Sequence, residues 1–483
     1  MTETALVWFR RDLRVRDNPT LAAAADADRL IPVYCFDPRE YGLREYGGER
    51  SFRFRKTGSH RVRFRRESVA DLRESLSARG SGLVVRRGRP EEVLPELAAA
   101  VDADRVFAQT LPAPEEVAVE NRATAALRDR GLAVHRFWTH TLYHVADLPT
   151  PFTAVDDTYT PFRKAVEAEA SVRDPVGVPD LPSPPASVGS GRVPAGEIPS
   201  PVDLDEALSD PTPDERAVHS FPGGEGAGRD RLKQYLWRGD HLREYKETRN
   251  GMLGADYSSK LSPWLNEGCL SPRAVEREVR RYEDERVANE STYWLLFELL
   301  WRDFFQFQSR KHGGAFFRRE GIRERTDLAW RGDGERLRRW KAGETGVPFV
   351  DANVRELVET GYVSNRGRQN AASFLANDLG VDWRRGAAFF ETHLVDYDPC
   401  SNYGNWAYVA GVGNDSRDRS FDVLGQARTY DPDAEYVKTW LPELDALSPE
   451  RAHEPWTMSE AEQEASGVRL GVDYPEPVVR PDG

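Results

Sequence analysis

The sequence predicts an α/β doubly wound N-terminal domain followed by an all-α C-terminal domain. Short apolar runs alternate with helical stretches over roughly residues 1–140, and strand-like runs disappear from residue 229 onward. Between the two, 11 of the 32 prolines fall within residues 171–226, a composition typical of an interdomain connector. We therefore expect an α/β domain at 1–140, a connector at 141–228, an all-α domain at 229–441 and an acidic tail at 442–483.

The N-terminal domain begins with two apolar runs, TALVWF (4–9) and RLIPVYCF (29–36). The segment between them opens with Asn–Pro, a helix-start signal, and continues rich in alanine. The runs GLVVRRG, RVFAQ and GLAVHRFW then alternate with the helical stretches PEEVLPELAAAV and VAVENRATAALRDRG. This repeated β-α-β pattern indicates a parallel sheet. No GxGxxG follows the first strand, so the usual dinucleotide fingerprint is missing.

The second half of the chain reads as helical. The segments expected to form helices are 229–237, 291–310, 349–359, 367–379 and 383–394. The passage LVDYDPCSNYGNWAYVAGVGND (394–415) is different, because no apolar period of two or 3.6 runs through its first half. It is too polar for a core strand and too aromatic for a solvated loop.

The composition favours a soluble, cytoplasmic protein. Mean hydropathy is −0.64, no apolar run approaches the ~18 residues of a membrane span, and the N-terminus lacks the layout of a signal peptide. The three cysteines, Cys35, Cys269 and Cys400, are far apart, which disfavours a disulfide scaffold or a zinc site. The pair His140 and His144 is interpreted as structural, so no metal is expected.

The charge balance is unusual. Net charge is −13, and 8 lysines leave 59 arginines among the 67 basic residues. Acid-rich, lysine-poor surfaces suit a halophile-like, high-salt cytoplasm, where charge keeps a protein hydrated. An acidic chain can still bind nucleic acid, but only through a local basic groove.

Two predicted helices carry polar groups on buried or shared faces. Glu298, Trp301 and Arg302 lie at i, i+3 and i+4 on an otherwise apolar helix, and a buried charge pair is costly unless something polar completes it. Asn365 and Arg368 share a face at a helix start, which suits a phosphate, a carboxylate or a ring carbonyl. A structural ion pair and a capping cluster remain the alternatives.

A run of hydroxyls, Tyr257, Ser258, Ser259 and Ser262, precedes an apolar helix. Hydroxyls with exposed backbone N–H groups form a pyrophosphate cradle, although serines also cap helices without any ligand. Together these groups describe a polar-lined pocket in a helical domain, large enough for a flat heteroaromatic cofactor with a diphosphate tail.

Five long motifs together resemble the photolyase/cryptochrome family, and their residues are most similar to those of its DASH cryptochrome branch. They are ALVWFRRDLRVRDNPTL, GADYSSKLSPWLNEGCLSPR, FELLWRDFFQF, SNRGRQNAASFLANDLGVDWR and DYDPCSNYGNWAYVAGVGND. The resemblance covers about residues 4 to 440. It implies a photolyase-like fold, with an α/β antenna domain and an all-α domain that holds FAD in a U shape. The passage 394–415 would then wrap the flavin.

The resemblance also implies roles for individual residues around FAD. Arg368 would pair with Asp396 beside the isoalloxazine, Asp398 would bond the polar edge or sugar, and Asn402 would face flavin N5. A neutral amide there can accept from N5–H without adding negative charge, whereas an aspartate would repel an anionic reduced flavin. The diphosphate, ribityl chain and cavity would be lined by Tyr245, Ser258, Ser259, Lys260, Leu261, Ser262, Glu298, Arg302 and Asn365.

Three tryptophans match the family's electron relay from flavin to surface: Trp406, Trp383 and Trp330. Without the resemblance, core packing would be the preferred interpretation of these residues. Each stands in a different segment of the predicted helical domain.

In the family, the substrate site is a cavity over the flavin that takes a pyrimidine dimer flipped out of the strand. By resemblance, Glu298 and Asn365 would bond the dimer, Trp301 would stack on it, and Arg249 would contact phosphate. Gln369 and Tyr408 stand where duplex-repairing photolyases usually carry Met and Trp. This more polar pair predicts preference for single-stranded or looped DNA. Asn365 and Gln369 also replace the two histidines of (6-4) repair, which disfavours that activity.

The resemblance leaves two functions open. The first is a deoxyribodipyrimidine photolyase, a monomeric lyase in which excited reduced flavin donates an electron to a cyclobutane dimer in DNA. The second is a blue-light photoreceptor or DNA-binding regulator with little or no repair. An antenna of methenyltetrahydrofolate between the domains also stays open, because Leu111 stands where an acid is expected and only Glu115 and Glu116 follow it.

Overall fold

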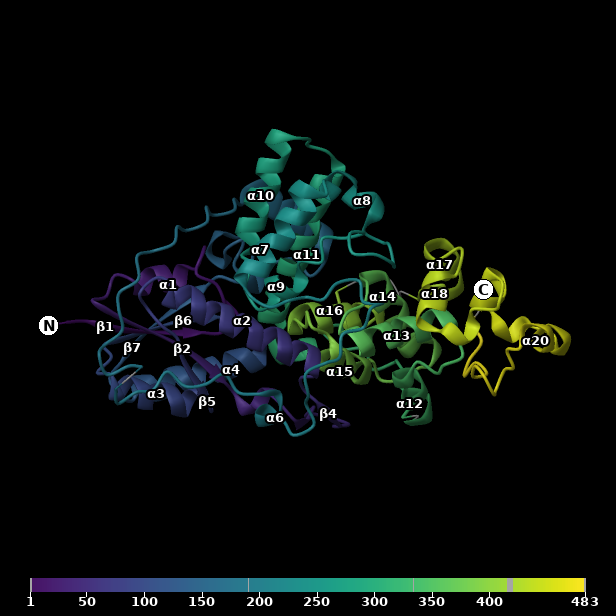
Figure 1. The fold of residues 1–483 in the computed structure, drawn as a ribbon, viewed down its shortest axis with the longest axis horizontal. Coiled ribbons are helices and arrows are strands. Elements are labelled where there is room, and N and C mark those ends of the chain that lie inside the picture. Colours follow the sequence, from purple (N-terminus) through teal and green to yellow (C-terminus); the bar gives the residue numbers. More distant parts are fainter. Residues whose placement is uncertain (1, 190, 333, 415–419, 482–483) are drawn as a thin grey trace.

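The computed structural model describes residues 2–189, 191–332, 334–414 and 420–481. It contains the predicted parallel sheet, with strand order β5-β2-β1-β6-β7 (Figure 1). The strands are β1 (Thr4–Phe9), β2 (Arg29–Phe36), β5 (Val84–Arg87), β6 (Arg105–Thr110) and β7 (Ala133–Trp138), and a separate short hairpin is formed by β3 (Leu43–Glu45) and β4 (Arg53–Arg55). All pairs in the five-stranded sheet are parallel, and the order reverses between β1 and β6.

Side chains of β1 alternate between the two faces of the sheet, as expected for a strand buried on both sides. Leu6 packs with the apolar residues of α3 (Pro90–Ala100) and α4 (Pro114–Arg128). Val7 lies in the opposite core with residues of α1 (Pro19–Ala24) and α2 (Ser59–Ser77). The sheet is therefore doubly wound, and the second core continues into the helical domain.

The helical domain contains the five predicted helices and others besides. The sequence-predicted helices correspond to α7 (Glu225–Lys233), α11 (Glu290–His312), α13 (Pro348–Thr360), α14 (Asn365–Ser373) and α15 (Trp383–His393), and α7 and α14 each continue into a π-helical turn. The additional helices are α8 (Tyr245–Thr248), α9 (Ser262–Asn266), α10 (Pro272–Glu285), α12 (Gly334–Ala342), α16 (Pro399–Val409) and α17 (Val423–Tyr430). The passage without a clear period thus contains a helix, α16.

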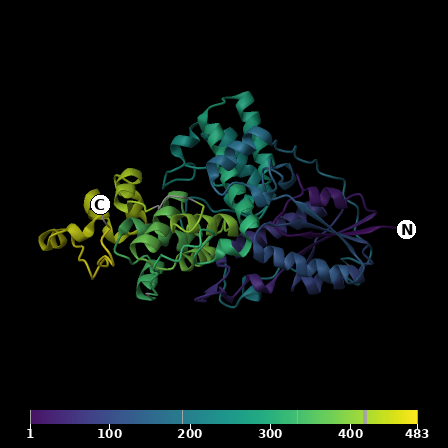
Figure 2. The same cartoon turned by 180° about the vertical axis from the view of Figure 1, so that it is seen from behind.

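The connector and the tail are built into the fold. Connector helix α5 (Tyr159–Glu169) packs on α11, where the ring of Tyr159 stacks on that of Trp301; α6 (Pro201–Leu204) also lies in the connector. The expected acidic tail contains α19 (Pro449–His453) and α20 (Glu460–Ser466) and follows α18 (Glu435–Trp440). Its Tyr474 hydroxyl donates to Asp351 on α13 at 2.6 Å. Figures 1 and 2 show these last helices at the opposite end of the molecule from the N-terminus.

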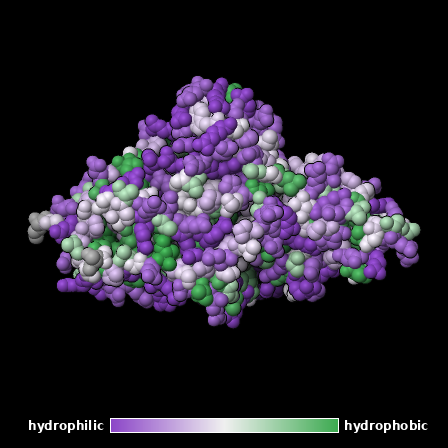
Figure 3. Space-filling model, viewed as in Figure 1, coloured by the Kyte–Doolittle hydropathy of each residue, from purple (hydrophilic) through white to green (hydrophobic). Residues whose placement is uncertain are grey.

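Hydrophilic residues dominate the face shown in Figure 3, where hydrophobic residues gather only in small groups. None of the helices in the described ranges is long and apolar enough to span a bilayer.

Candidate functional site

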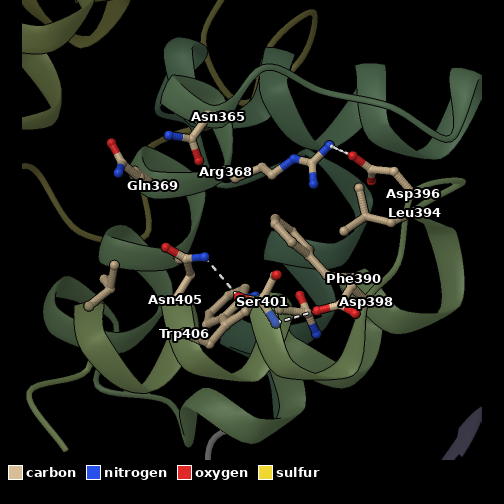
Figure 4. Close-up of a pocket in the computed structure, with 13 residues that line it drawn as sticks. Asn365, Arg368, Gln369, Phe390, Leu394, Asp396, Asp398, Ser401, Asn405 and Trp406 are labelled. Carbon is tan, nitrogen blue, oxygen red and sulfur yellow. Dashed lines mark hydrogen bonds and ion pairs between the residues drawn. The ribbon is translucent and has the colours of Figure 1, made fainter. Parts of the chain in front are cut away.

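A cavity lies between α14, α15 and α16 (Figure 4). Its walls carry amides, two carboxylates, one guanidinium and an indole. The lining residues are Asn365, Arg368, Gln369, Ala372, Phe390, Leu394, Asp396, Asp398, Ser401, Asn402, Asn405, Trp406 and Val409. The structure therefore brings together six residues that the sequence assigned to the cofactor or to the relay: Asn365, Arg368, Asp396, Asp398, Asn402 and Trp406.

The predicted pairing of Arg368 with Asp396 is present. Arg368 Nη2 lies 2.9 Å from Asp396 Oδ2, and Ser262 Oγ donates to the same oxygen at 2.6 Å. Burial works against the charge on Arg368, but Asp396 overcomes it and raises the pKa of the guanidinium. Asp396 Oδ1 is buried without a hydrogen-bond partner. A buried, unpartnered carboxylate oxygen in a cavity wall indicates a missing donor, which a ligand can supply.

Asp398 caps the N-terminus of α16 and is ionised. Its carboxylate accepts from the Ser401 N–H at 2.7 Å. Burial opposes the charge, but the nearby Arg302 and Arg11 guanidinium groups hold the pKa of Asp398 well below its usual range. Arg302 Nη2 lies 2.7 Å from His140 Nε2, so the imidazole accepts that bond and is neutral; burial, followed by Arg302, lowers the pKa of His140 to about 3. Arg302 therefore joins α11 to His140, at the end of the α/β domain, and is not part of the cavity lining.

Asn402 and Trp406 lie one turn apart on α16. Asn402 Nδ2 donates to the Ala387 carbonyl on α15 at 3.0 Å, which leaves the amide oxygen available to a ligand. Trp406 is almost fully buried and reaches the cavity with part of its ring. The α15–α16 contact thus fixes the orientation of the amide at the cavity wall.

The hydroxyl run lies beside this cavity and does not line it. Arg231 on α7 donates to the backbone carbonyls of Ser258 and Ser259, at 3.0 and 2.9 Å. Lys260 follows in the left-handed region at φ 53°, with its Nζ 3.1 Å from the centroid of the Tyr257 ring. Burial lowers the pKa of Lys260 to about 6. Ser262 of this run contacts the lining through its hydrogen bond to Asp396; the predicted Tyr245 and Leu261 are buried in the adjoining core.

The predicted substrate residues occupy two places. Gln369 and Asn365 line the cavity, whereas Glu298 and Trp301 stand on α11 outside that lining. Trp301 stacks on Tyr159 with 3.6 Å between ring centroids, and its ring lies 6.2 Å from that of Tyr408, edge to face.

Arg249 and Glu298, assigned separately to phosphate and base, form an ion pair at 2.5 Å. Arg249 also lies over the Trp294 ring, 4.6 Å from its centroid. Burial raises the pKa of Glu298, and Arg249 partly offsets this shift.

Arg366 is a candidate contact that sequence reasoning missed. Its guanidinium donates to the amide oxygens of Gln369, Gln426 and Asn250, each at 3.1 Å, and lies over the Tyr430 ring. These acceptors are all neutral, so the positive charge stays available to an anion. In the sequence, the signal that could have identified Arg366 was its position directly after Asn365 in the motif SNRGR.

The three tryptophans that the resemblance assigns to a relay differ in their surroundings. Trp383 is fully buried, and its N–H donates to the Arg319 carbonyl at 3.0 Å. Trp330 is half-buried. The ring nearest to Trp406 among the described tryptophans is that of Trp340, 6.0 Å away, edge to face. Trp340 was not predicted to belong to the site.

A second cavity of about 850 Å³ lies between the α/β domain and the helical domain. It receives the carboxyl ends of β1, β2 and β6, the edge at which open α/β sheets bind ligands. Leu111 lines it as an apolar residue. Glu115 pairs with Lys56, and Glu116 pairs with Arg11 at 3.1 Å.

Comparison with known proteins agrees with this architecture. The model of the DNA photolyase family matches residues 5–185, and that of the FAD binding domain of DNA photolyase matches residues 294–482. Cryptochrome DASH of Natronomonas pharaonis is 61% identical over 480 residues, covering 99% of this chain and 98% of that protein. Cryptochrome DASH of Gloeobacter violaceus is 51% identical over 481 residues, covering 99% and 93%.

Solved structures extend the likeness to three dimensions. The cryptochrome of Synechocystis sp. PCC6803 superposes with a TM-score of 0.93 at 45% identity, covering 99% of this chain and 96% of that one. The archaeal photolyase of Sulfolobus tokodaii, solved with two FAD molecules, superposes with a TM-score of 0.74 at 26% identity, covering 99% and 96%. On its sequence, its domains and its fold, the chain belongs to the photolyase/cryptochrome family, and cryptochromes DASH are its relatives over the full length.

Proposed function

We propose that this protein is a blue-light-driven, FAD-dependent photolyase that splits cyclobutane pyrimidine dimers and prefers single-stranded or looped DNA. The cavity between α14, α15 and α16, with a volume of about 80 Å³, would hold part of the flavin. Dimers are cheapest to extract where the strand is not stacked in a duplex, because flipping then costs least.

The cavity residues fit FAD. Asp396 presents one buried, unpartnered oxygen, and its other oxygen is paired with Arg368. The unpartnered oxygen suits an N–H or hydroxyl donor of a flavin, and Asp398 adds a second ionised acceptor. When bound and reduced, FAD supplies the light-absorbing group and the electron used to split the dimer. The protein's part is to orient that group and exclude water from it.

The repair assignment rests on the orientation of the Asn402 amide. Its amide nitrogen is bonded to the Ala387 carbonyl, so its oxygen is the group that remains for the cofactor. An amide oxygen accepts a hydrogen bond without bringing a negative charge next to a reduced, anionic ring. The resemblance associates Asn at this position with repair enzymes, whereas plant-type photoreceptors carry Asp there.

The assignment is tested with two oligonucleotides of one sequence, each containing one dimer, one single-stranded and one in a duplex. Under blue light we expect the FAD-loaded protein to remove the dimer from the single strand faster than from the duplex, with no loss in the dark. Asn402→Asp is the matched variant, isosteric but charged, and should lose activity while keeping FAD. FAD-loaded wild type that repairs neither strand in the light would favour the photoreceptor alternative.

For the interdomain cavity we propose an antenna chromophore of the folate class. Its volume of about 850 Å³ suits a flat heteroaromatic group, and it lies at the ligand-binding edge of the sheet. Titration with methenyltetrahydrofolate tests this directly. A bound folate should transfer excitation to the flavin, and Lys56→Ala and Arg11→Ala should weaken its binding. If folate fails to bind the FAD-loaded protein, the antenna assignment is wrong and the repair assignment is unaffected.

A further inference from the structure

Beside the proposed tryptophan relay lies a tyrosine whose hydroxyl donates to a carboxylate. Tyr403 lies one turn before Trp406 on α16, and its ring centroid is 6.2 Å from that of Trp383 on α15, at an interplanar angle of 71°. Both rings are at most 2% exposed. Among described residues, no ring contact joins Trp383 to Trp330. The aromatic side chain in contact with Trp383 is therefore this tyrosine.

The hydrogen bonds of the two rings differ in kind. Trp383 donates to a backbone carbonyl, that of Arg319, which cannot take a proton. Tyr403 donates its hydroxyl to Glu391 Oε2 at 2.8 Å. The other carboxylate oxygen of Glu391 lies 3.4 Å from Lys56 Nζ.

This difference decides where an electron hole is most stable. A tryptophan radical cation at Trp383 would keep its positive charge in a buried place. A phenol that loses an electron becomes a strong acid, and Tyr403 has a carboxylate in line to take its proton. Burial, together with Glu391, raises the pKa of Tyr403, so the phenol keeps its proton until it is oxidised.

We propose that Tyr403 reduces the radical cation of Trp383 and passes its phenolic proton to Glu391. One electron moves from Tyr403 to Trp383, the Tyr403 O–H bond breaks, and an O–H bond forms on Glu391. The products are neutral Trp383, a neutral tyrosyl radical and a neutral carboxylic acid. The oxidant that starts the sequence is photoexcited oxidised flavin, acting through Trp406, so the inference rests on the proposed FAD site.

Tyr46 provides a matched control. Its ring lies 5.8 Å from that of Tyr403, but its hydroxyl donates to the Phe317 carbonyl at 2.8 Å. It therefore has the position of a further donor without a base to take its proton. The proposal predicts that the radical stays on Tyr403.

The test uses the FAD-loaded, oxidised protein after a light flash, observed by transient absorption and electron paramagnetic resonance. In wild type we expect a tyrosyl radical to appear as the tryptophan radical decays, more slowly in D₂O than in H₂O. Tyr403→Phe should abolish the tyrosyl signal and leave the tryptophan radical. Glu391→Gln should do the same although Tyr403 is still present, whereas Tyr46→Phe should change neither signal. FAD content is measured in each variant to confirm that it is folded.

Wild type tests the step itself even if a variant fails to bind FAD, and the variants assign the radical to Tyr403. A tryptophan radical that decays in wild type without any tyrosyl radical would overturn it, and so would a tyrosyl signal that survives in Tyr403→Phe or disappears in Tyr46→Phe. No tryptophan radical at all in the FAD-loaded protein would overturn both the relay and this step. Failure to split dimers, by contrast, would concern only the repair assignment.

Discussion

Arg249 and Glu298 form an ion pair, in which Arg249 Nη1 lies 2.5 Å from Glu298 Oε1. A phosphate that takes Arg249 therefore removes the cation that holds Glu298 ionised. Burial alone already raises the pKa of Glu298, and the loss of Arg249 would raise it further. Dimer binding should thus convert Glu298 into a protonated hydrogen-bond donor.

This pair predicts that affinity for dimer DNA depends on pH. The pKa of Glu298 is raised, so its protonated fraction is highest at low pH and falls as pH rises through that pKa. Affinity should fall with it. Glu298→Gln keeps a donor at every pH and should flatten the profile. The measurement is the Kd for a single-stranded dimer oligonucleotide across pH, with Arg249→Lys as the charge-preserving control. A Glu298→Gln profile as steep as wild type would contradict this role.

A second prediction concerns Arg368 and Asp396. Removing one partner of a buried ion pair leaves the other charge uncompensated, at a cost of about 3–5 kcal/mol. Asp396→Ala and Arg368→Ala should therefore lose most bound FAD. Asp396→Asn, which keeps the shape, should lose less. Flavin released from purified protein gives the occupancy directly, and full occupancy in both alanine variants would remove this pair from the FAD site.

The third prediction concerns the relay. Trp406→Phe should abolish light-driven reduction of oxidised FAD without loss of binding, because its ring lies at the cavity wall and is the proposed first donor. Trp383→Phe and Trp330→Phe should weaken it. Chemically pre-reduced Trp406→Phe should still split dimers, since the relay only loads the electron. Normal photoreduction in all three variants would identify them as core tryptophans.

The sequence predicts the fold well because its signals are local. Alternating apolar runs give the sheet, and long apolar periods give α11, α13 and α15. Helix α16 lacks such a period, because one of its faces is turned to the cavity and carries Asn402 and Asn405. Its remaining signal was the N-cap, Asp398, followed by proline.

The site was only partly predictable, because partners in it come from distant segments. The pairing of Arg368 with Asp396 was expected from the resemblance and is present. The pairing of Arg302 with His140 was not, since 162 residues separate them and each has a plausible local role. Long-range choices of this kind depend on how helices pack, which no local pattern records.

A fourth prediction concerns stability. Glu356 on α13 is buried and accepts from the Tyr436 hydroxyl at 2.6 Å. Burial raises its pKa to about 8, despite the opposing effects of Tyr436 and Lys260. Between about pH 4, its ordinary range, and pH 8 the native state binds more protons than the unfolded state, so stability falls as pH rises.

Glu356→Gln removes this titration and keeps an acceptor. Its free energy of unfolding relative to wild type should grow by about 1.4 kcal/mol per pH unit across the window. Denaturant unfolding at several pH values measures the difference. Lys260 interacts with Glu356, and its own lowered pKa acts in the opposite direction above about pH 6, so the slope is read below that pH. A constant difference across pH would show that Glu356 is ionised in the native state.

The last prediction concerns salt and substrate. The chain has a net charge of −13, and Arg249 must leave Glu298 before it can contact phosphate. Each phosphate neutralised on a single strand lowers log K by about 0.7 per log unit of salt. In molar salt that contribution is largely lost. Stacking on Trp301, worth roughly 1–3 kcal/mol per base, would then carry the affinity. Tyr159 supports this role, because it fixes the indole by stacking against it.

We therefore expect a shallow salt dependence of binding to single-stranded dimer DNA. Trp301→Ala should weaken binding more than Arg249→Gln does in molar salt, and Trp301→Phe, which keeps an aromatic face, should recover part of the loss. Titrations of labelled oligonucleotide from low to molar salt measure both slopes. A steep slope that becomes shallower only in Arg249→Gln, together with equal binding of dimers in a full duplex, would mean that phosphate contacts dominate. Stacking on Trp301 would then be secondary, and the polar pair Gln369 and Tyr408 would not set the preference for single strands.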